Sequence, residues 1–335
     1  MSNKHNFELY EQIEDFDNIP TIRNVPERQL RGHQKPKAKP PSHKTDTVLE
    51  LAEAENNLDF TYSAAKHEKE WLISSLKEFH QQGWFNDVLR LIKGGGKEAS
   101  VYQCVANSTN TSQYIAAKVY RPRKFRQLRN DALYRQGRLY LDDEGHEIRD
   151  DRALHAIAKR TRFGMSLMHT SWIEHEFQAM KLLHKAGADI PEPYASGNNA
   201  ILMAYIGWDD LAAPTLNEVH LSSKETKDVF DRVLNNVRIM LANGRVHGDL
   251  SAYNILYCEG DITLIDFPQV LDPQVNQAAY NIFCRDIRRI CEYFQSQGLD
   301  CHPQTLADEL WREGGFDIGP SSVASLMPLE TPQEA

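Results

Sequence analysis

Asp249, Asn254 and Asp266 stand at a spacing that suits phosphoryl transfer. The first two fall in HGDLSAYNILY, and Asp266 follows the short apolar run 262–265, which reads as a strand. An aspartate on a tight loop can orient a hydroxyl, while an asparagine amide oxygen and a second aspartate bind a divalent cation. Taken singly, these residue types are common in turns and caps, but their joint spacing favours a metal-dependent phosphotransferase.

A glycine-rich turn lies upstream, in VLRLIKGGGKEASVYQCV from Val88 to Val105, and the segment reads as strand, turn, strand. Glycines let the backbone approach phosphate groups without a Cβ clash, although a plain hairpin turn is the alternative. The turn does not match a Walker loop, because Glu98 stands where Ser or Thr would hold magnesium. The predicted phosphate contacts are Gly95, Gly96, Lys97, Glu98, Ala99, Ser100 and Val101.

Lys118 lies in the apolar strand YIAAKVY, where a charged side chain needs a partner of opposite charge. The segment TSWIEHEFQAMKLLHKAG predicts a helix that stops at Gly187 and carries acidic residues beside its buried stripe. Glu176 is the expected partner of Lys118, and Glu174 is the alternative that the sequence leaves open. Such an ion pair positions a lysine against the phosphates of ATP.

The ordered set GKEASVY, AAKVY, HEFQAMKLL, LMAYIG, HGDLSAYNILY and LIDFPQ resembles the RIO family of atypical serine/threonine protein kinases, from about Trp71 to about Phe294. Its loops are similar to the family patterns GKEAxVY and DLSxxN. Ordinary protein kinases have a lysine where Ser251 stands, and aminoglycoside phosphotransferases usually have a histidine. RDIRRICEYF, from Arg285, follows Asp266 almost at once, as in RIO proteins, with no long activation segment between them.

The resemblance implies an α+β, bilobal protein-kinase-like fold. It has a small N-lobe with an antiparallel sheet and a helix, and a mostly helical C-lobe that lacks the usual activation segment. ATP and Mg²⁺, or Mn²⁺ in its place, would bind between the lobes, with Met203 as the gatekeeper and adenine against Ala204 to Ile206. By the same resemblance, the catalytic residues are Asp249, Lys118 and Glu176, and the metal ligands are Asn254 and Asp266.

The sequence also departs from the family pattern at two places, the glycine turn and the hinge. Gly94 and Gly95 replace a pair such as Ser-Thr, and Ala204 replaces a common acidic residue of the hinge. Because a hinge binds adenine through its backbone, alanine there does not argue against ATP. Pro268 stands near the glycine of the DFG motif of ordinary kinases, and a rigid proline argues against large movements of that loop.

The expected reaction is transfer of a phosphoryl group from ATP to Ser or Thr of a protein, including the protein itself. Thr161, Ser166 and Thr170 are candidate acceptors in the chain. An alternative within RIO-like chemistry makes Asp266 the phosphoryl acceptor, which gives an ATPase. A small-molecule phosphotransferase with an aminoglycoside or choline-like acceptor, and a nucleotide-binding scaffold without turnover, are the other classes that the sequence leaves open.

Composition indicates a protein of the cytoplasm that does not enter a membrane. The net charge of −9 does not favour bulk attraction to nucleic acid or anionic lipid, and no apolar stretch is long enough to span a bilayer. The five cysteines show no metal-ligand spacing and lie in apolar contexts, so we expect them to be reduced core residues. His247 is expected to anchor the catalytic loop rather than act as a base.

Sequence composition also divides the chain. Helices are expected over 47–58 and over 64–82, the second packed on the small lobe. The insert between Lys118 and Glu176 is rich in arginine with interleaved aromatics. Because acidic residues interrupt the basic ones, a solvated loop with a helix near 152–159 is the favoured interpretation, and contact of the insert 121–165 with RNA or a ribosomal particle is the alternative. The predicted order is a disordered polar tail over 1–45 and a RIO-type kinase domain over 46–335, with N-lobe 64–203, flexible insert 121–165, C-lobe 204–315 and flexible tail 316–335.

Overall fold

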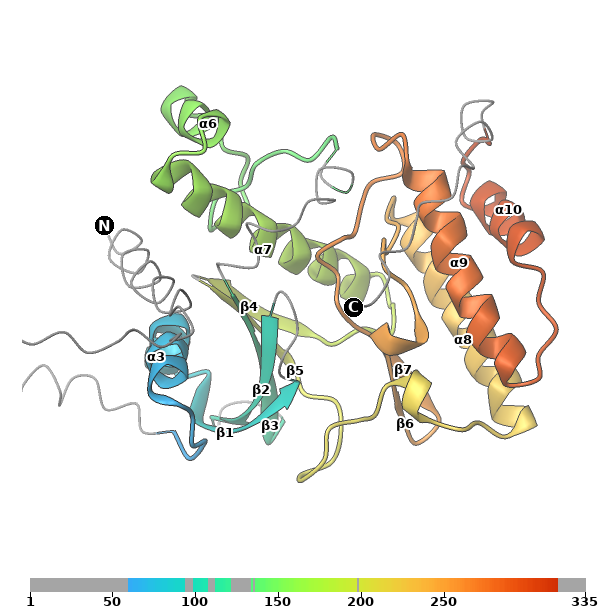
Figure 1. Cartoon of the computed structure of the whole chain (residues 1–335), viewed down its shortest axis with the longest axis horizontal. Helices are drawn as coiled ribbons and strands as arrows, with labels where there is room; N and C mark the ends of the chain where they lie inside the picture. The colour runs from blue at the N-terminus through green and yellow to red at the C-terminus, as the bar shows by residue number, and fades with distance from the viewer. Residues whose placement is uncertain are drawn as a thin grey trace, which may run out of the picture.

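The structure is a computed structural model that describes residues 60–93, 99–107, 112–121, 134, 136–197 and 199–318. It has two lobes, one built around an antiparallel sheet and the other mainly helical (Figure 1). This confirms the expected α+β, bilobal architecture. The tail 1–45, the predicted helix 47–58, the glycine turn 94–98 and the end of the chain from 319 lie outside the described residues.

A five-stranded antiparallel sheet forms the N-lobe, with its strands adjacent in the order β1-β2-β3-β5-β4. The bounds are β1 (Phe85–Lys93), β2 (Ala99–Ala106), β3 (Tyr114–Tyr120), β4 (Pro193–Gly197) and β5 (Ala200–Ala204). The central strand β3 pairs with β2 and β5, so that Lys118 lies opposite Val101 on one side and Ile201 on the other. The two strands predicted on either side of the glycine-rich segment are therefore β1 and β2.

Two helices pack on opposite faces of β3. Helix α3 (Lys66–Gln81) packs through residues such as Leu72 and Leu76 in one core cluster with Ile115, Ala117 and Val119. Ala116 and Tyr120 belong instead to the main core, together with the long helix α7 (Arg162–Lys185). Successive side chains of a strand point to opposite faces, so Lys118, between Ala116 and Tyr120 in this alternation, faces the α7 side.

The described part of the insert contains regular structure. Helix α6 (Asp151–Ala158) is capped by Asp150, and the Thr161 side chain caps α7 by accepting from Gly164 N at 3.1 Å. The two helices touch closely, because a Cβ on Gly164 would lie 2.0 Å from the Ala156 carbonyl oxygen. The insert expected to be flexible over 121–165 thus contains the helix predicted near 152–159 and the first turn of α7, while 122–133 lies outside the described residues.

The C-lobe is mainly helical, and its two short strands directly follow the catalytic loop. Its elements are η2 (Leu216–Glu218), α8 (Ser223–Ala242), η3 (Ala252–Asn254), β6 (Ile255–Cys258), β7 (Asp261–Leu264), α9 (Ala279–Ser296) and α10 (Pro303–Glu313). Helix α8 starts with a capping box of Ser222 and Glu225. Figure 1 shows α8, α9 and α10 side by side at the end of the molecule farthest from α3.

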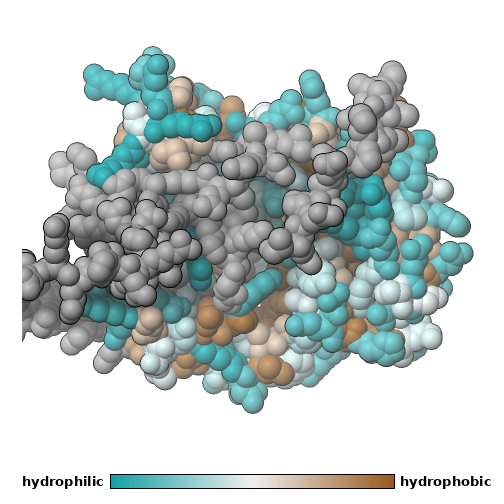
Figure 2. Space-filling view, viewed as in Figure 1, coloured by the Kyte–Doolittle hydropathy of each residue, from teal (hydrophilic) through white to brown (hydrophobic). Residues whose placement is uncertain are grey.

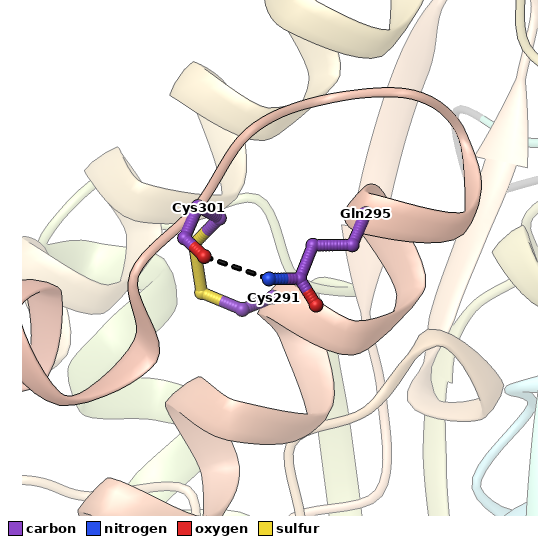
Figure 3. The surroundings of a disulfide bond; sticks show 3 residues. All are labelled: Cys291, Gln295 and Cys301. Carbon is purple, nitrogen blue, oxygen red and sulfur yellow. Dashed lines mark hydrogen bonds between the residues drawn. A yellow bond between two sulfur atoms is a disulfide. The ribbon is translucent and has the colours of Figure 1, made fainter.

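Cysteine chemistry differs from the expectation. Cys291 of α9 and Cys301 form a disulfide with a Cα–Cα distance of 5.7 Å, and Gln295 Nε2 donates to the Cys301 carbonyl at 2.7 Å (Figure 3). The expectation that all five cysteines are reduced is wrong for this pair, because the turn after α9 returns the chain to the helix. Cys104 and Cys284 are free and buried, and Cys258 is free and partly exposed.

Among the described residues, no helix combines the length and apolar composition that crossing a bilayer requires. Figure 2 shows one face whose coloured surface is mainly hydrophilic, with hydrophobic residues in small separate groups.

Candidate active site

Lys118 and Glu176 form a buried ion pair between β3 and α7. The lysine Nζ lies 2.6 Å from Glu176 Oε1, and the glutamate side chain is 1% exposed. Glu174 points elsewhere: its carboxylate accepts from Ser196 Oγ at 2.8 Å and from Gln178 Nε2 at 2.6 Å. The structure thus selects the expected partner of Lys118 over the alternative.

The Glu176 carboxylate has two further donors that the sequence did not suggest. Tyr120 OH donates to Oε2 at 2.5 Å, and the backbone N–H of Phe267 donates to Oε1 at 3.3 Å. Tyr120 is two residues after Lys118 on the same face of β3, which is the signal that could have identified it. Because Phe267 follows Asp266, Glu176 connects α7 to the segment that carries a predicted metal ligand.

Asp266 is the second carboxylate at the lysine. Its Oδ1 lies 2.5 Å from Lys118 Nζ, and its side chain is 40% exposed. Burial disfavours the charge on Lys118, but the carboxylates of Asp266 and Glu176 outweigh it and raise the lysine pKa above its ordinary value. Burial likewise disfavours the charge on Asp266, and the attraction of Lys118 outweighs it, so the Asp266 pKa is lowered. Both groups are charged at neutral pH.

The backbone of Asp266 adopts a left-handed conformation, with φ of 73°. This region disfavours residues with a Cβ, although aspartate tolerates it better than most. Strained residues of this kind concentrate at functional sites. Asp266 therefore combines an unfavourable backbone conformation with a direct contact to Lys118.

Asn254 lies beside Asp266 because the N–H of Ile265 donates to the Asn254 backbone carbonyl at 2.9 Å. The Asn254 side-chain nitrogen donates to Asp249 O at 2.9 Å and to its Oδ2 at 3.3 Å. With its amino end used on Asp249, the amide presents its oxygen as the remaining ligand atom. Amide and carboxylate oxygens suit Mg²⁺, which takes few protein ligands and completes its shell with water and phosphate oxygens, so this pair fits that ion.

Two charged residues of α9 anchor the loop that carries Asp249. The buried Asp286 accepts from the N–H of Gly248 at 2.8 Å, and Arg285 donates to the Gly248 carbonyl and lies 3.2 Å from Asp286. Burial raises the pKa of Asp286 to about 6, although Arg285 opposes this. Gly248 has a φ of 85°, and a Cβ there would lie 2.3 Å from the Gln269 carbonyl oxygen, so only glycine fits. An aspartate inside the buried stripe of the helix was the available signal for this anchor.

The Asp249 carboxylate itself contacts α9. Arg289 Nη1 lies 2.6 Å from Asp249 Oδ1. His247 Nε2 lies 3.2 Å from the Ile265 carbonyl, and its Nδ1 accepts from Asp249 N at 3.3 Å, which defines the tautomer. Burial lowers the His247 pKa although Asp249 and Asp266 oppose this, so the ring is neutral at neutral pH. These contacts agree with its expected role as an anchor.

The residues expected to bind adenine lie at the junction of the lobes. Met203 is buried on β5, and the N–H of Ala204 donates to the Glu192 carbonyl at 2.8 Å. The Ile206 carbonyl accepts from Ala213 N at 3.0 Å.

Among the expected phosphate contacts, Ser100 is fully buried and its Oγ accepts from Arg121 Nη2 at 2.8 Å, while Ala99 and Val101 pack on the main core. The others, Gly95, Gly96, Lys97 and Glu98, lie outside the described residues.

Comparison with known proteins identifies the family. The family model for the RIO domain matches residues 100–306. The serine/threonine-protein kinase RIO1 of Chaetomium thermophilum is 32% identical over 224 residues, which cover 64% of this chain and 40% of that protein. The RIO-type serine/threonine-protein kinase Rio1 of Haloferax volcanii is 26% identical over 224 residues, which cover 66% of this chain and 68% of that protein. The alignment therefore spans well under half of the Chaetomium protein.

A solved structure shares the fold. The Rio2 kinase–ADP/Mg²⁺–phosphoaspartate complex from Chaetomium thermophilum aligns with a TM-score of 0.51 at 18% identity, over 96% of this chain and 91% of that chain. The family model matches well over half of the sequence, and the motifs that carry the resemblance lie within or directly beside the matched residues. The chain therefore belongs to the RIO family.

Proposed function

We propose that the protein is a RIO-type serine/threonine kinase that transfers the γ-phosphoryl group of ATP to a protein hydroxyl, including its own. The observation that carries this proposal is the convergence on one site of Lys118, paired with Glu176, and the carboxylate of Asp266. Asn254 accepts from the N–H of Ile265, next to Asp266, and its side chain donates to the Asp249 carbonyl. A cation, two metal-binding oxygens and a carboxylate for the hydroxyl are the parts that phosphoryl transfer requires.

Each side chain has a separate task in the proposed mechanism. Lys118, kept in place by Glu176, neutralises phosphate oxygens of ATP, and Asn254 with Asp266 would hold Mg²⁺. When bound, this ion neutralises charge on the phosphates. Asp266 contacts Lys118 directly in the structure, so uptake of a cation by Asp266 would compete with that contact and free the lysine for phosphate.

Asp249 orients the acceptor hydroxyl and receives its proton. A bond forms between the acceptor oxygen and the γ-phosphorus while the bond from that phosphorus to the bridging oxygen breaks, which leaves ADP. The Asp249 carboxylate suits this task because its loop is anchored twice on α9, through Gly248 and through its own Oδ1. Positioned groups of this kind act mainly through preorganised electrostatics.

A second route has an observation in its favour. The related Rio2 kinase complex contains phosphoaspartate together with ADP and Mg²⁺. Asp266 is the corresponding candidate here, because its carboxylate is partly exposed and lies beside Lys118. In this route an Asp266 oxygen attacks the γ-phosphorus and ADP leaves; water, losing a proton to Asp249, then hydrolyses the acyl phosphate.

Labelled ATP separates the two routes. Purified protein is incubated with γ-labelled ATP and Mg²⁺, and the label is assigned to Ser/Thr, to a hydroxylamine-sensitive carboxyl phosphate or to free phosphate. Kinase activity predicts label on Ser/Thr, which Asp249→Ala abolishes; the aspartyl-phosphate route predicts hydroxylamine-sensitive label that Asp266→Asn removes. Rapid phosphorylation of an aminoglycoside or choline-like compound would favour the small-molecule class instead.

The protein substrate is proposed to supply its own docking surface, because the chain has no long segment between Asp266 and α9 for binding peptides. A cytoplasmic location is part of the proposal, since ATP is available there, and cell fractionation tests it. Contact of the insert with RNA or a ribosomal particle stays a prediction. Of its described aromatics, Phe163 is 60% exposed, whereas Tyr134 accepts from Arg285 at 2.8 Å.

A further inference from the structure

In the mechanism above, the ion pair of Arg289 with Asp249 serves only to anchor the catalytic loop. The guanidinium extends from α9 to Oδ1 of the carboxylate, and the side chains of Arg289 and Asp249 are 39% and 35% exposed. A partly exposed pair contributes little to stability. The loop is already anchored through Asp286 and Arg285, so the fold does not require this third contact.

Phosphoryl transfer places negative charge on the oxygens of the migrating group, and fixed cations there lower the barrier. Ordinary protein kinases carry a lysine in the catalytic loop where this chain has the uncharged Ser251. Lys118 lies on the nucleotide side, beside Glu176 and Asp266, where the proposed mechanism uses it for the phosphates of ATP. Among the described residues, Arg289 is the cation in contact with the carboxylate that receives the acceptor hydroxyl.

We propose that Arg289 is a catalytic residue that supplies, from α9, the positive charge that the catalytic loop itself lacks at Ser251. A guanidinium has several N–H donors in a rigid fork that matches phosphate as well as carboxylate. One donor holds Asp249 Oδ1, and another contacts an oxygen of the γ-phosphoryl group as it passes from ADP to the acceptor. The inference rests on the proposed kinase function and deepens it.

The competing role for Arg289 is to position Asp249 without contacting the phosphoryl group. Removing Asp249 separates the two roles, because an arginine that acts only through that carboxylate has no function in the Asp249→Asn background. A direct contact with the phosphoryl group persists there. Binding of a transition-state mimic measures it without turnover: ADP with Mg²⁺ and aluminium fluoride, compared with ADP and Mg²⁺ alone.

The variants are Arg289→Gln, Arg289→Lys and the matched control Arg288→Gln, which removes the same charge from an exposed position of the same helix. We expect Arg289→Gln to weaken binding of the aluminium fluoride complex about 100-fold, while the Kd for ADP changes less than about twofold. The same loss in binding of the aluminium fluoride complex is expected in the Asp249→Asn background. Arg289→Lys, which keeps the charge, should lose roughly tenfold or less, and Arg288→Gln should match the wild type.

Moving the charge gives an independent test. Ser251→Lys in the Arg289→Gln protein should recover at least about tenfold in kcat, because the loop then provides the cation itself. The proposal is overturned if Arg289→Gln has no effect on the mimic, if its effect disappears in the Asp249→Asn background, or if Ser251→Lys restores nothing. Failure of the kinase function gives a different result. Wild-type protein would then bind ADP with Mg²⁺, but aluminium fluoride would not tighten that binding, and the protein would not turn over ATP.

Discussion

Tyr120→Phe tests whether the buried carboxylate of Glu176 organises the site. Tyr120 is fully buried, and its ring packs edge-on against Trp172 with 4.9 Å between centroids. Phenylalanine keeps that packing and removes the hydroxyl that donates to Glu176 Oε2 at 2.5 Å. The oxygen is left without this donor in a side chain that is 1% exposed, and a hydrogen bond to a charged group contributes about 1.5–3 kcal/mol. We expect unfolding free energy to fall by about 2–3 kcal/mol.

Tyr102→Phe is the matched control. Tyr102 is also fully buried, on the neighbouring strand β2, and its hydroxyl donates to Glu68 Oε1 at 2.8 Å. Glu68 keeps a second donor in Tyr62 at 3.2 Å and is partly exposed, so water compensates for the lost hydroxyl. The cost of this control should stay near the ordinary value for a hydrogen bond, about 1 kcal/mol or less.

Urea unfolding at pH 7, followed by tryptophan fluorescence, measures both variants. With similar m values, the larger loss should appear as a lower midpoint for Tyr120→Phe than for Tyr102→Phe. Because Lys118 binds the other oxygen of Glu176, the KM for ATP should change less than about threefold. Equal midpoints for the two variants would refute the argument that Glu176 depends on the Tyr120 hydroxyl.

Lys118→Ala should leave a folded protein, checked by circular dichroism, whose ATP turnover is reduced at least about 100-fold; wild-type turnover would remove Lys118 from the site. Asp266→Asn and Asn254→Ala should each shift the Mg²⁺ titration of turnover to at least about tenfold higher concentration, and unchanged titrations would contradict their role as ligands. Burial raises the Asp286 pKa to about 6 in the folded protein, so its contribution to stability is present below pH 4 and is lost as pH rises through 6. Between these limits wild-type protein should lose up to about 3 kcal/mol relative to Asp286→Asn in urea unfolding, and parallel pH curves would contradict the shift.

Local sequence was sufficient to predict most of the candidate site. Asp249 and Asn254 share one loop, and Lys118 and Asp266 lie in or beside short apolar strands whose alternation and turns are properties of neighbouring residues. The helix predicted over 64–82 is α3, because its apolar stripe has helical spacing and Gly83 follows it with a φ of 79°. Family membership followed from the same short motifs.

The three-dimensional fold decided which of these residues meet. Glu174 and Glu176 are both buried, but they are two residues apart on a helix that turns about 100° per residue, so their side chains point to different neighbours. The orientation of α7 against β3 therefore determines that Glu176 is the partner of Lys118. Tyr120 was predicted as a strand residue, and the packing of α7 turned it into a hydrogen-bond donor to Glu176.

Contacts between distant segments were the least predictable. Asp286, Arg285 and Arg289 reach the loop of Asp249 from a helix that lies 37 to 40 residues farther along the chain. The Cys291–Cys301 bond depends in the same way on the path of the turn after α9. Residue type and local periodicity define what a side chain can do, whereas the packing of α9 against the catalytic loop defines where it does so, because that packing depends on the whole core.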